Sequence, residues 1–336
     1  MDPDSIDAVD PVTHGSSDDP ELLDFSANTN PVVPDGVEAV YEEAVGTTEV
    51  GELPDPDAFR SAAADVVGCD AAAVVPTRGG IEAIRLAIAV TVTPGDSVLV
   101  PAPSFSEYAR EVELQGGIPR FVPAEEIVDI DPADYALAIV CQPNNPTGRA
   151  IDPDRLRAFV ARCREAGTPL LVDEAFLDFT DYDSLAGVPG VIVARSLTKM
   201  YGLPGLRVGY AAATGSPGER LRTASQPEAI AGPALAVGTH CLQQAEFVAE
   251  MKRRVRSERE RLREGLSERF DVFPSEAPFL LLDVGERDVD DILVSAREAG
   301  LVLRDARTFR RLDSHVRVAV RLPAENDELL EVLGDV

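Results

Sequence analysis

The chain has 336 residues, of which 45% are apolar, enough for a large α/β domain with a smaller one attached. Its formal net charge is -28, from 59 acidic and 31 basic residues, so we expect neither nucleic acid nor an anionic membrane among its partners. Lysine occurs only at Lys199 and Lys252, and this acidic, lysine-poor composition favours a halophilic protein from a salt-rich cytoplasm, with an acidic composition of no special habitat as the alternative.

The cysteines and the N-terminal residues favour the same compartment. The four cysteines are far apart and form no C-x-x-C pair, which is typical of single buried thiols in a reduced cytoplasm. Residues 1–15 are acidic and lack an apolar core, so we expect no signal peptide. No apolar run approaches ~20 residues, the length that spans a membrane. We therefore expect a cytoplasmic protein.

The first two thirds of the chain predict an N-terminal arm followed by a large α/β domain. Residues 1–35 are rich in Pro, Asp, Ser and Asn, and we expect an extended arm there. From about residue 70 to 213, short apolar runs alternate with helical patterns, which predicts a mostly parallel sheet covered on both faces. One such helix is Asp152–Gly167, with Asp152 as N-cap and Pro153 at its first position. We assign residues 36–215 to this domain. The apolar runs are Ala73–Pro76, Ser97–Pro101, Leu137–Cys141, Leu170–Val172, Val191–Ala194 and Arg207–Ala213.

The last third of the chain predicts a smaller α+β domain. The glycines in 215–218 mark a boundary, and we assign residues 216–336 to this domain. Its long first helix carries many Glu/Arg pairs, and these pairs predict a face exposed to solvent. The expected elements are helices Phe247–Arg269 and Val289–Gly300 and strands Phe279–Val284, Leu301–Arg304 and Val316–Arg321.

A turn of small residues precedes a predicted helix at residues 77–84, TRGGIEAI. Such a turn lets backbone N–H groups approach a phosphate, although an ordinary glycine turn accounts for it about as well. It is not a P-loop, because no Lys-Ser/Thr pair follows Gly79 and Gly80. The chain also lacks G-x-G-x-x-G, which argues against a dinucleotide enzyme, and no metal site is expected.

Asp173 ends a predicted buried strand in the sequence LLVDEAFLDF, residues 170–179. A carboxylate at that position needs a partner to offset its desolvation. The magnesium-binding acid of a P-loop ATPase is excluded by the missing P-loop. A protonated pyridine nitrogen is the more specific candidate for the partner of Asp173, because an aspartate keeps that ring charged and able to take up electrons. A surface or capping aspartate is the alternative.

Lys199 stands in SLTKMYGLPGLRVGY, residues 196–210, of a chain that almost avoids lysine. Arginine is always protonated and cannot form an imine, whereas a desolvated lysine can lose its proton and do so. Ser196 and Arg207 bracket this lysine at spacings suited to holding one anion. The alternative is a solvent-facing lysine without a role.

The order of these motifs resembles the fold-type I enzymes that depend on pyridoxal 5′-phosphate (PLP), in the class I/II aminotransferase family. Within that family the chain is most similar to threonine-phosphate decarboxylases and histidinol-phosphate aminotransferases. The resemblance extends from His14-Gly15 and DFSANTNP (24–31) to VRVAVRLPAEND (316–327). Its most specific parts are CQPNNPTG (141–148), VDEAF (172–176) and SLTK with GLRVG (196–209). It implies the fold-type I fold, a mostly parallel sheet with a smaller C-terminal α+β domain, and PLP as cofactor.

The resemblance also implies residue roles. Lys199 matches the lysine that carries the cofactor, Asp173 the acid on the pyridine nitrogen, and Asn145 the residue bonded to the ring hydroxyl. Arg317 matches the arginine that receives the substrate carboxylate, for which its fork of donors is suited. The phosphate cup matches Gly79, Gly80, Ile81, Ser196 and Arg207; Phe105 matches the aromatic residue stacked on the ring; and Asn30, Arg321, Arg304, Arg78 and His14 are candidates for binding substrate or its phosphate.

Two positions depart from the family pattern. Phe176 stands where aminotransferases of this group usually have a Tyr bonded to the ring oxygen, and Phe resembles the decarboxylase branch more closely. Leu53 stands where relatives often have a Tyr that reaches across the dimer, so that hydrogen bond is in doubt. We expect a homodimer that decarboxylates L-threonine O-3-phosphate. The alternatives are histidinol-phosphate aminotransferase activity and a PLP-binding protein without catalysis.

Overall fold

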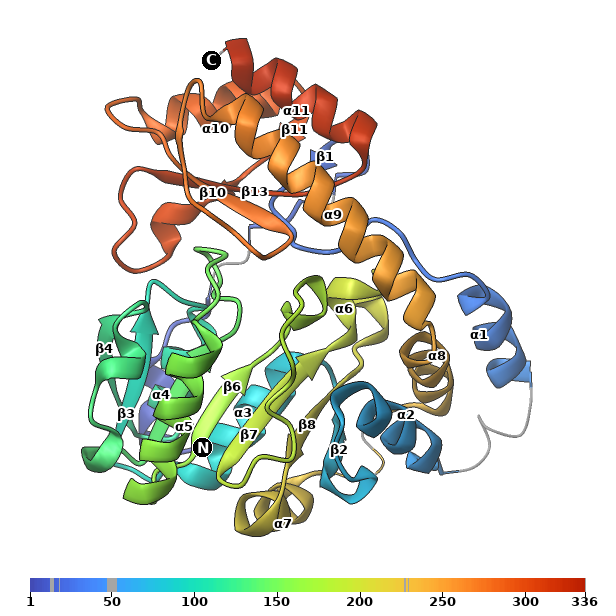
Figure 1. The fold of residues 1–336 in the computed structure, drawn as a ribbon, viewed down its shortest axis with the longest axis vertical. Coiled ribbons are helices and arrows are strands. Elements are labelled where there is room, and N and C mark those ends of the chain that lie inside the picture. The colour runs from blue at the N-terminus through green and yellow to red at the C-terminus, as the bar shows by residue number, and fades with distance from the viewer. Residues whose placement is uncertain (13–14, 18, 47–52, 227, 229, 336) are drawn as a thin grey trace.

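A computed structural model describes residues 1–12, 15–17, 19–46, 53–226, 228 and 230–335. It contains a large seven-stranded sheet with helices on both faces and, above it in Figure 1, a smaller four-stranded sheet with its own helices. The long helix α9 (Ala245–Leu266) leads from one part to the other. The predicted α/β class with a smaller α+β part is therefore confirmed.

The large sheet has the strand order β2-β8-β7-β6-β5-β3-β4. All its neighbouring strands are parallel except β8, which runs antiparallel to β2 and β7. The central strands are buried on both faces, which explains their continuous apolar sequence. The strands are β2 (Val74–Thr77), β3 (Ser97–Ala102), β4 (Ile118–Pro123), β5 (Leu137–Cys141), β6 (Leu170–Asp173), β7 (Val191–Ser196) and β8 (Gly209–Ala213).

Two apolar layers form because successive strand residues point to opposite faces. Val172 and Val193 pack toward α2 and α5, whereas Leu171 and Ile192 pack toward α3, α4 and α7. At the start of α5 the Asp152 carboxylate accepts hydrogen bonds from two backbone N–H groups, as the N-cap pattern predicts. The helices here are α1 (Val37–Gly46), α2 (Asp57–Val67), α3 (Gly80–Thr91), α4 (Glu107–Leu114), α5 (Pro153–Ala166), α6 (Leu197–Met200), α7 (Gly215–Ala224) and α8 (Gly232–Leu242).

The division of the chain after residue 215 stays a prediction, and packing favours a later position. α7 contacts α3 and β8, and α8 contacts α1 and α2, so both helices lie against the large part. We propose that the boundary lies near the start of α9.

The smaller sheet has the strand order β12-β13-β10-β9 and is antiparallel throughout. A two-stranded parallel pair beside it joins the N-terminal arm to the C-terminal part, because Leu23 pairs with Leu301. Short 3-10 helices lie at Pro3–Ala8, Ala71–Ala73, Ile127–Asp129, Pro132–Asp134, Leu177–Phe179, Pro204–Leu206 and Ala306–Thr308. The other elements are β1 (Leu23–Asp24), β9 (Asp271–Val272), β10 (Phe279–Asp283), β11 (Leu301–Val302), β12 (Arg304–Asp305), β13 (His315–Ala319), α10 (Val289–Glu298) and α11 (Pro323–Asp335).

Two expectations about this part are corrected. The strand predicted to reach Arg321 ends at Ala319, and Arg321 lies in the connection to α11. The charged pairs of α9 do not all form a solvated face, since Glu258 and Arg259 are buried. Glu258 accepts a hydrogen bond of 2.8 Å from the buried Asn326 amide of α11, so it serves the packing of the two helices.

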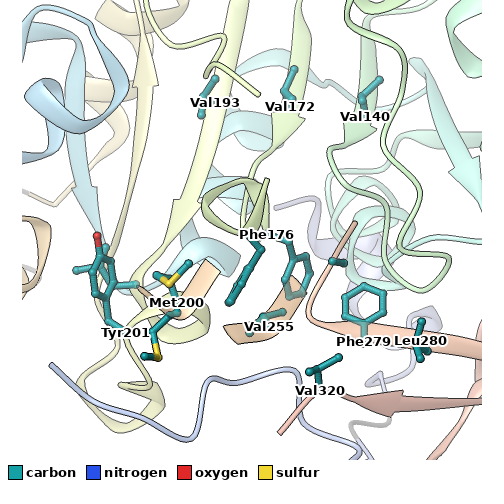
Figure 2. Packing of buried hydrophobic residues seen from close by; sticks show 14 of the residues in the cluster. Val140, Val172, Phe176, Val193, Met200, Tyr201, Val255, Phe279, Leu280 and Val320 are labelled. Atoms are coloured by element: carbon teal, nitrogen blue, oxygen red, sulfur yellow. The ribbon is translucent and has the colours of Figure 1, made fainter. Parts of the chain in front are cut away.

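One apolar cluster continues from the large sheet into the smaller part (Figure 2). Phe176, just after β6, meets Phe279 of β10 edge to face, with ring centroids 5.1 Å apart. This contact fixes the end of β6 against the smaller sheet. Across the described residues, no helix is both long and apolar enough to cross a membrane.

Candidate active site

The carboxyl ends of the parallel strands bring the sequence motifs together. Asp173 is the last residue of β6 and Ser196 the last residue of the neighbouring β7. Ser196 is the N-cap of α6, and its side chain accepts a hydrogen bond from the backbone N–H of Thr198. Lys199 follows one residue later, on this short helix. Residues from two motifs therefore lie at one sheet edge.

Gly79 and Gly80 lie at the start of α3, where the backbone comes close to Arg207 and Ser196. A Cβ on Gly79 would lie 2.8 Å from Nη2 of Arg207, and its φ of +83° disfavours other residues. A Cβ on Gly80 would lie 3.1 Å from Cβ of Ser196. The N-terminus of α3, a hydroxyl and a guanidinium thus surround one small space, which suits a phosphate. Ile81 follows at the exposed end of α3.

The Asp173 carboxylate is buried, with 6% of the residue exposed. Tyr108 of α4 donates its hydroxyl to one carboxylate oxygen at 2.5 Å, and the backbone N–H of Ala175 donates to the other at 3.0 Å. Burial raises the pKa of Asp173, while these hydrogen bonds and the nearby Lys199 act in the opposite direction. A cationic partner would stabilise the charged form further.

Burial lowers the pKa of Lys199 to about 8, and the positive charges of Arg317 and Arg207 add to this effect, against the raising effect of Asp173. The neutral, nucleophilic form of the amine is therefore far more populated near neutral pH than in an ordinary lysine. Its nitrogen lies 5.9 Å from the centre of the Phe176 ring.

Tyr108 is a site residue that the sequence reasoning missed. It is fully buried and meets Phe105, three residues earlier, edge to face with ring centroids 5.7 Å apart. Phe105 is half-buried at the end of the loop after β3. The only sequence signal for Tyr108 was this spacing, which puts both aromatic residues near the sheet edge. Nothing local indicates that its hydroxyl meets an aspartate 65 residues away.

Arg317 of β13 extends from the smaller sheet toward these groups. Its guanidinium donates to Oδ1 of Asn145 and, at 2.7 Å, to the carbonyl oxygen of Ser26. Burial lowers the pKa of Arg317 to about 9, and the nearby Arg304 adds to the shift. Its Nε is buried without a hydrogen-bond partner among the described residues.

Arg304 of β12 is the register partner of Arg317, so both side chains start from the same face of the sheet. It is buried, and its guanidinium donates to Oγ1 of Thr308 at 2.9 Å. Both guanidinium groups lie over Phe309, with distances to the ring centre of 5.3 Å for Arg304 and 5.7 Å for Arg317. The two guanidinium groups thus lie together over one aromatic ring.

The other described residues that the sequence suggested as substrate ligands form hydrogen bonds or ion pairs within the protein. Arg321 donates twice to Glu325, at 3.1 and 3.0 Å, and at 3.0 Å to the carbonyl oxygen of Asp24. Arg78 is exposed and pairs with Glu82 at 2.7 Å. The Asn30 side chain bonds to Met200 and Arg254.

Two further residues named from the sequence are His14, a candidate for the substrate phosphate, and Leu53, where a cross-subunit hydrogen bond is in doubt. His14 lies outside the described residues. Leu53 is 76% exposed and has no donor group, as its sequence position implied.

The donor set fits PLP. A phosphate matches the space bounded by Gly79, Ser196 and Arg207, where the backbone comes close to a hydroxyl and a guanidinium. A ring nitrogen matches the Asp173 carboxylate, and an aldehyde matches the amine of Lys199 with its lowered pKa.

Comparisons with known proteins agree with this geometry. The family model for aminotransferases of class I and II matches residues 20–333. The chain is 30% identical to "Histidinol-phosphate aminotransferase 2" of Archaeoglobus fulgidus, over 95% of this chain and 94% of that protein. It is 31% identical to "Threonine-phosphate decarboxylase" of Salmonella typhimurium, over 94% of this chain and 91% of that protein.

Solved structures show the same fold. The histidinol-phosphate aminotransferase of Clostridium acetobutylicum superposes with a TM-score of 0.85 at 24% identity, covering 94% of this chain and 98% of that one. The L-threonine-O-3-phosphate decarboxylase of Porphyromonas gingivalis gives 0.83 at 24% identity, with coverage of 94% and 99%. Another neighbour, from Sinorhizobium meliloti, is a complex with PLP, with a TM-score of 0.83 and coverage of 94% and 91%. The chain belongs to the class I and II aminotransferase family, and its cofactor is PLP.

Proposed function

We propose that this protein decarboxylates L-threonine O-3-phosphate to (R)-1-aminopropan-2-yl phosphate, in cobalamin biosynthesis. The observation that supports it most is Phe176, three residues after Asp173, where aminotransferases of this group usually have Tyr. Phe176 is buried against Phe279 and offers no hydroxyl to the cofactor ring. Its sequence position resembles the decarboxylase branch.

The two arginines of the smaller sheet support a substrate with two anionic groups. Arg317 is assigned to the carboxylate, by its match to the family position. Arg304 is the better of the remaining candidates for the substrate phosphate, because it is buried beside Arg317 whereas Arg321 is held by Glu325. Side chains from register partners are close enough to bind one short molecule.

Each residue then has a chemical task. When bound, PLP supplies an electron sink for the bonds at the substrate Cα. Asp173, fixed by Tyr108 and the Ala175 amide, holds a proton at the ring nitrogen. In the proposed reaction the bond between Cα and the carboxylate breaks, CO₂ leaves, and the ammonium of Lys199 delivers a proton to Cα.

Binding at two points would decide which bond breaks. A carboxylate held by Arg317 and a phosphate held by Arg304 restrict rotation of the substrate about its own bonds. The residues common to decarboxylases and aminotransferases do not distinguish the two reactions, so the critical difference is the orientation of the bound substrate. We expect the fixed separation of the two guanidinium groups to select that orientation.

Histidinol-phosphate aminotransferase is the second candidate, because relatives of about the same identity carry that name. Its substrates are histidinol phosphate, which has a phosphate but no carboxylate, and 2-oxoglutarate, which has two carboxylates, so the two adjacent arginines are compatible with this candidate as well. A PLP-binding protein without catalysis is the third possibility. Carrying the cofactor alone gives no reason for a buried Arg317 near Lys199 and Asp173.

We also propose a cytoplasmic homodimer from a salt-rich cell. Several apolar side chains near α1 are unusually exposed, which supports a second copy of the chain as their cover. The exposed fractions are 40% for Val33, 45% for Tyr41, 47% for Val45 and 76% for Leu53. The net charge of -28 supports the salt-rich habitat.

A paired assay tests the proposed reaction. The purified protein with PLP is given L-threonine O-3-phosphate labelled in its carboxylate, and labelled CO₂ is measured. In parallel it is given histidinol phosphate with 2-oxoglutarate, and glutamate is measured. Sustained CO₂ release without glutamate supports the decarboxylase. Glutamate without CO₂ establishes the aminotransferase instead.

A further inference from the structure

The peptide segment 24–30 connects the two halves of the site. Its first residues bind the smaller sheet: the carbonyl oxygen of Phe25 accepts from the backbone N–H of Ala319 at 2.8 Å, and that of Ser26 accepts from Arg317. Its last residue, Asn30, binds the turn that holds Lys199. Only a few residues therefore separate the arginine anchor from the reactive lysine.

Asn30 holds the lysine turn through the main chain. Its backbone N–H donates to the carbonyl oxygen of Lys199 at 2.9 Å, and its Nδ2 donates to that of Met200 at 2.8 Å. Packing is tight at the same place, because a Cβ on Gly202 would lie 2.7 Å from the carbonyl oxygen of Asn30. Asn30 is 4% exposed, so its contacts are with protein rather than solvent.

Arg254 of α9 fixes Asn30 in turn. Its guanidinium donates to Oδ1 of Asn30 and to the carbonyl oxygen of Arg321, both at 2.7 Å. This side chain therefore bridges segment 24–30 and the chain just after β13, which carries Arg317. Because Arg254 donates to Oδ1 of Asn30, the Nδ2 group of the same amide faces the carbonyl oxygen of Met200.

We propose that Asn30 and Arg254 are positioning residues that hold the Lys199 turn at a fixed place relative to the Arg317 strand. Asn30, which the sequence suggested as a substrate ligand, then acts through the lysine rather than on the substrate. The proposal concerns how the PLP-bearing lysine is held and is independent of which bond at Cα the enzyme breaks.

The test uses the holoenzyme and two readouts that need no substrate. The first is amide hydrogen exchange at Asn30, whose N–H reports directly on the bond to Lys199. The second is the visible absorbance of bound PLP as a function of pH, which is sensitive to how Lys199 presents its amine. The variants are Arg254→Met and Asn30→Asp, with the exposed neighbour Arg253→Met as the matched control.

Arg254→Met should make the Asn30 amide exchange about tenfold faster, as expected when one supporting hydrogen bond is lost. The midpoint of the absorbance titration should move by about half a pH unit or more. Asn30→Asp keeps an acceptor for Arg254 but turns an oxygen toward the Met200 carbonyl, so it should also move the midpoint. Arg253→Met should match the wild type in both readouts.

Two results would overturn the proposal. One is unchanged exchange and an unchanged absorbance midpoint in Arg254→Met. The other is an Asn30→Asp protein with wild-type absorbance but weakened protection of the enzyme by L-threonine O-3-phosphate or histidinol phosphate against thermal unfolding, which would make Asn30 a substrate ligand. If Arg254→Met does not fold, Arg254→Lys, which keeps the charge but not the paired donors, decides by the same readouts.

Discussion

The two sheets contribute to the site in different ways. At the large sheet, Asp173 and Ser196 end adjacent strands, and Lys199 follows Ser196 by three residues, so short motifs determine their positions. At the smaller sheet, Arg317 and Arg304 come together only through the pairing of β12 with β13. The cofactor side thus depends on local sequence, whereas the substrate side depends on long-range register.

The two sides of the site also differ in the charge of the groups that contact their ionised side chains. The Asp173 carboxylate has a hydroxyl and an amide donor, with the positive Lys199 nearby. The named acceptors of Arg317 are an amide oxygen and a carbonyl oxygen, which carry no net charge. The difference teaches that the protein itself supplies donors to the Asp173 carboxylate, whereas the Arg317 guanidinium meets only neutral acceptors and is suited to an anionic ligand.

The largest expected effect tests the cofactor side at Lys199. Lys199→Ala should lower turnover on the order of 10⁴-fold or more, because the proton-transferring amine is lost. Borohydride reduction of the wild-type holoenzyme, followed by peptide mapping, should find the pyridoxyl group on Lys199. Lys252 is the natural control, since it pairs with the exposed Asp181. A label on Lys252 would contradict the assignment.

A somewhat smaller effect is expected at Asp173. Asp173→Asn should keep the fold but reduce turnover on the order of 10³-fold, because a neutral amide does not hold the ring nitrogen protonated. Circular dichroism checks the fold, and steady-state kinetics measures turnover. Near-normal turnover in the variant would mean that Asp173 has only a structural role.

The substrate side gives a contrast between two arginines. Arg304→Met should raise KM for the phosphorylated substrate about 100-fold, since it removes a buried cation from a bound anion. Arg321→Met should change KM much less and instead lower the melting temperature, because Arg321 pairs with Glu325. Steady-state kinetics and thermal unfolding of both variants separate the two roles. A large rise in KM for Arg321→Met, with little change in KM for Arg304→Met, would instead assign the substrate phosphate to Arg321.

This contrast marks the limit of what the sequence could predict. Lys199, Asp173 and the alternation of strands and helices around them follow from local motifs and apolar periodicity, which depend on neighbouring residues only. The alternation of Val316, Val318 and Val320 suggested a strand through Arg321, but hydrogen bonding in β13 ends at Ala319. The contact between Tyr108 and Asp173 joins distant parts of the chain, so no local pattern indicates it.

Salt should affect the whole molecule rather than one side of the site. With a net charge of -28, transfer to low-salt buffer should lower the melting temperature markedly, because repulsion among carboxylates is then unscreened. Differential scanning calorimetry over a series of potassium chloride concentrations measures the dependence. A melting temperature that does not vary with salt would remove the basis for the salt-rich habitat.

The smallest expected effect links the two sides, because Arg317 on one lowers the pKa of Lys199 on the other. Only the neutral amine attacks an aldehyde, so the rate at which the apoprotein binds PLP should rise with pH and level off above the Lys199 pKa of about 8. Arg317→Met removes a positive neighbour, which raises that pKa and should move the midpoint to higher pH. Asp173→Asn removes a negative neighbour and should move it to lower pH. Stopped-flow absorbance follows the binding, with Arg253→Met as the control. Shifts of the same sign in both variants would mean that the midpoint does not report on Lys199.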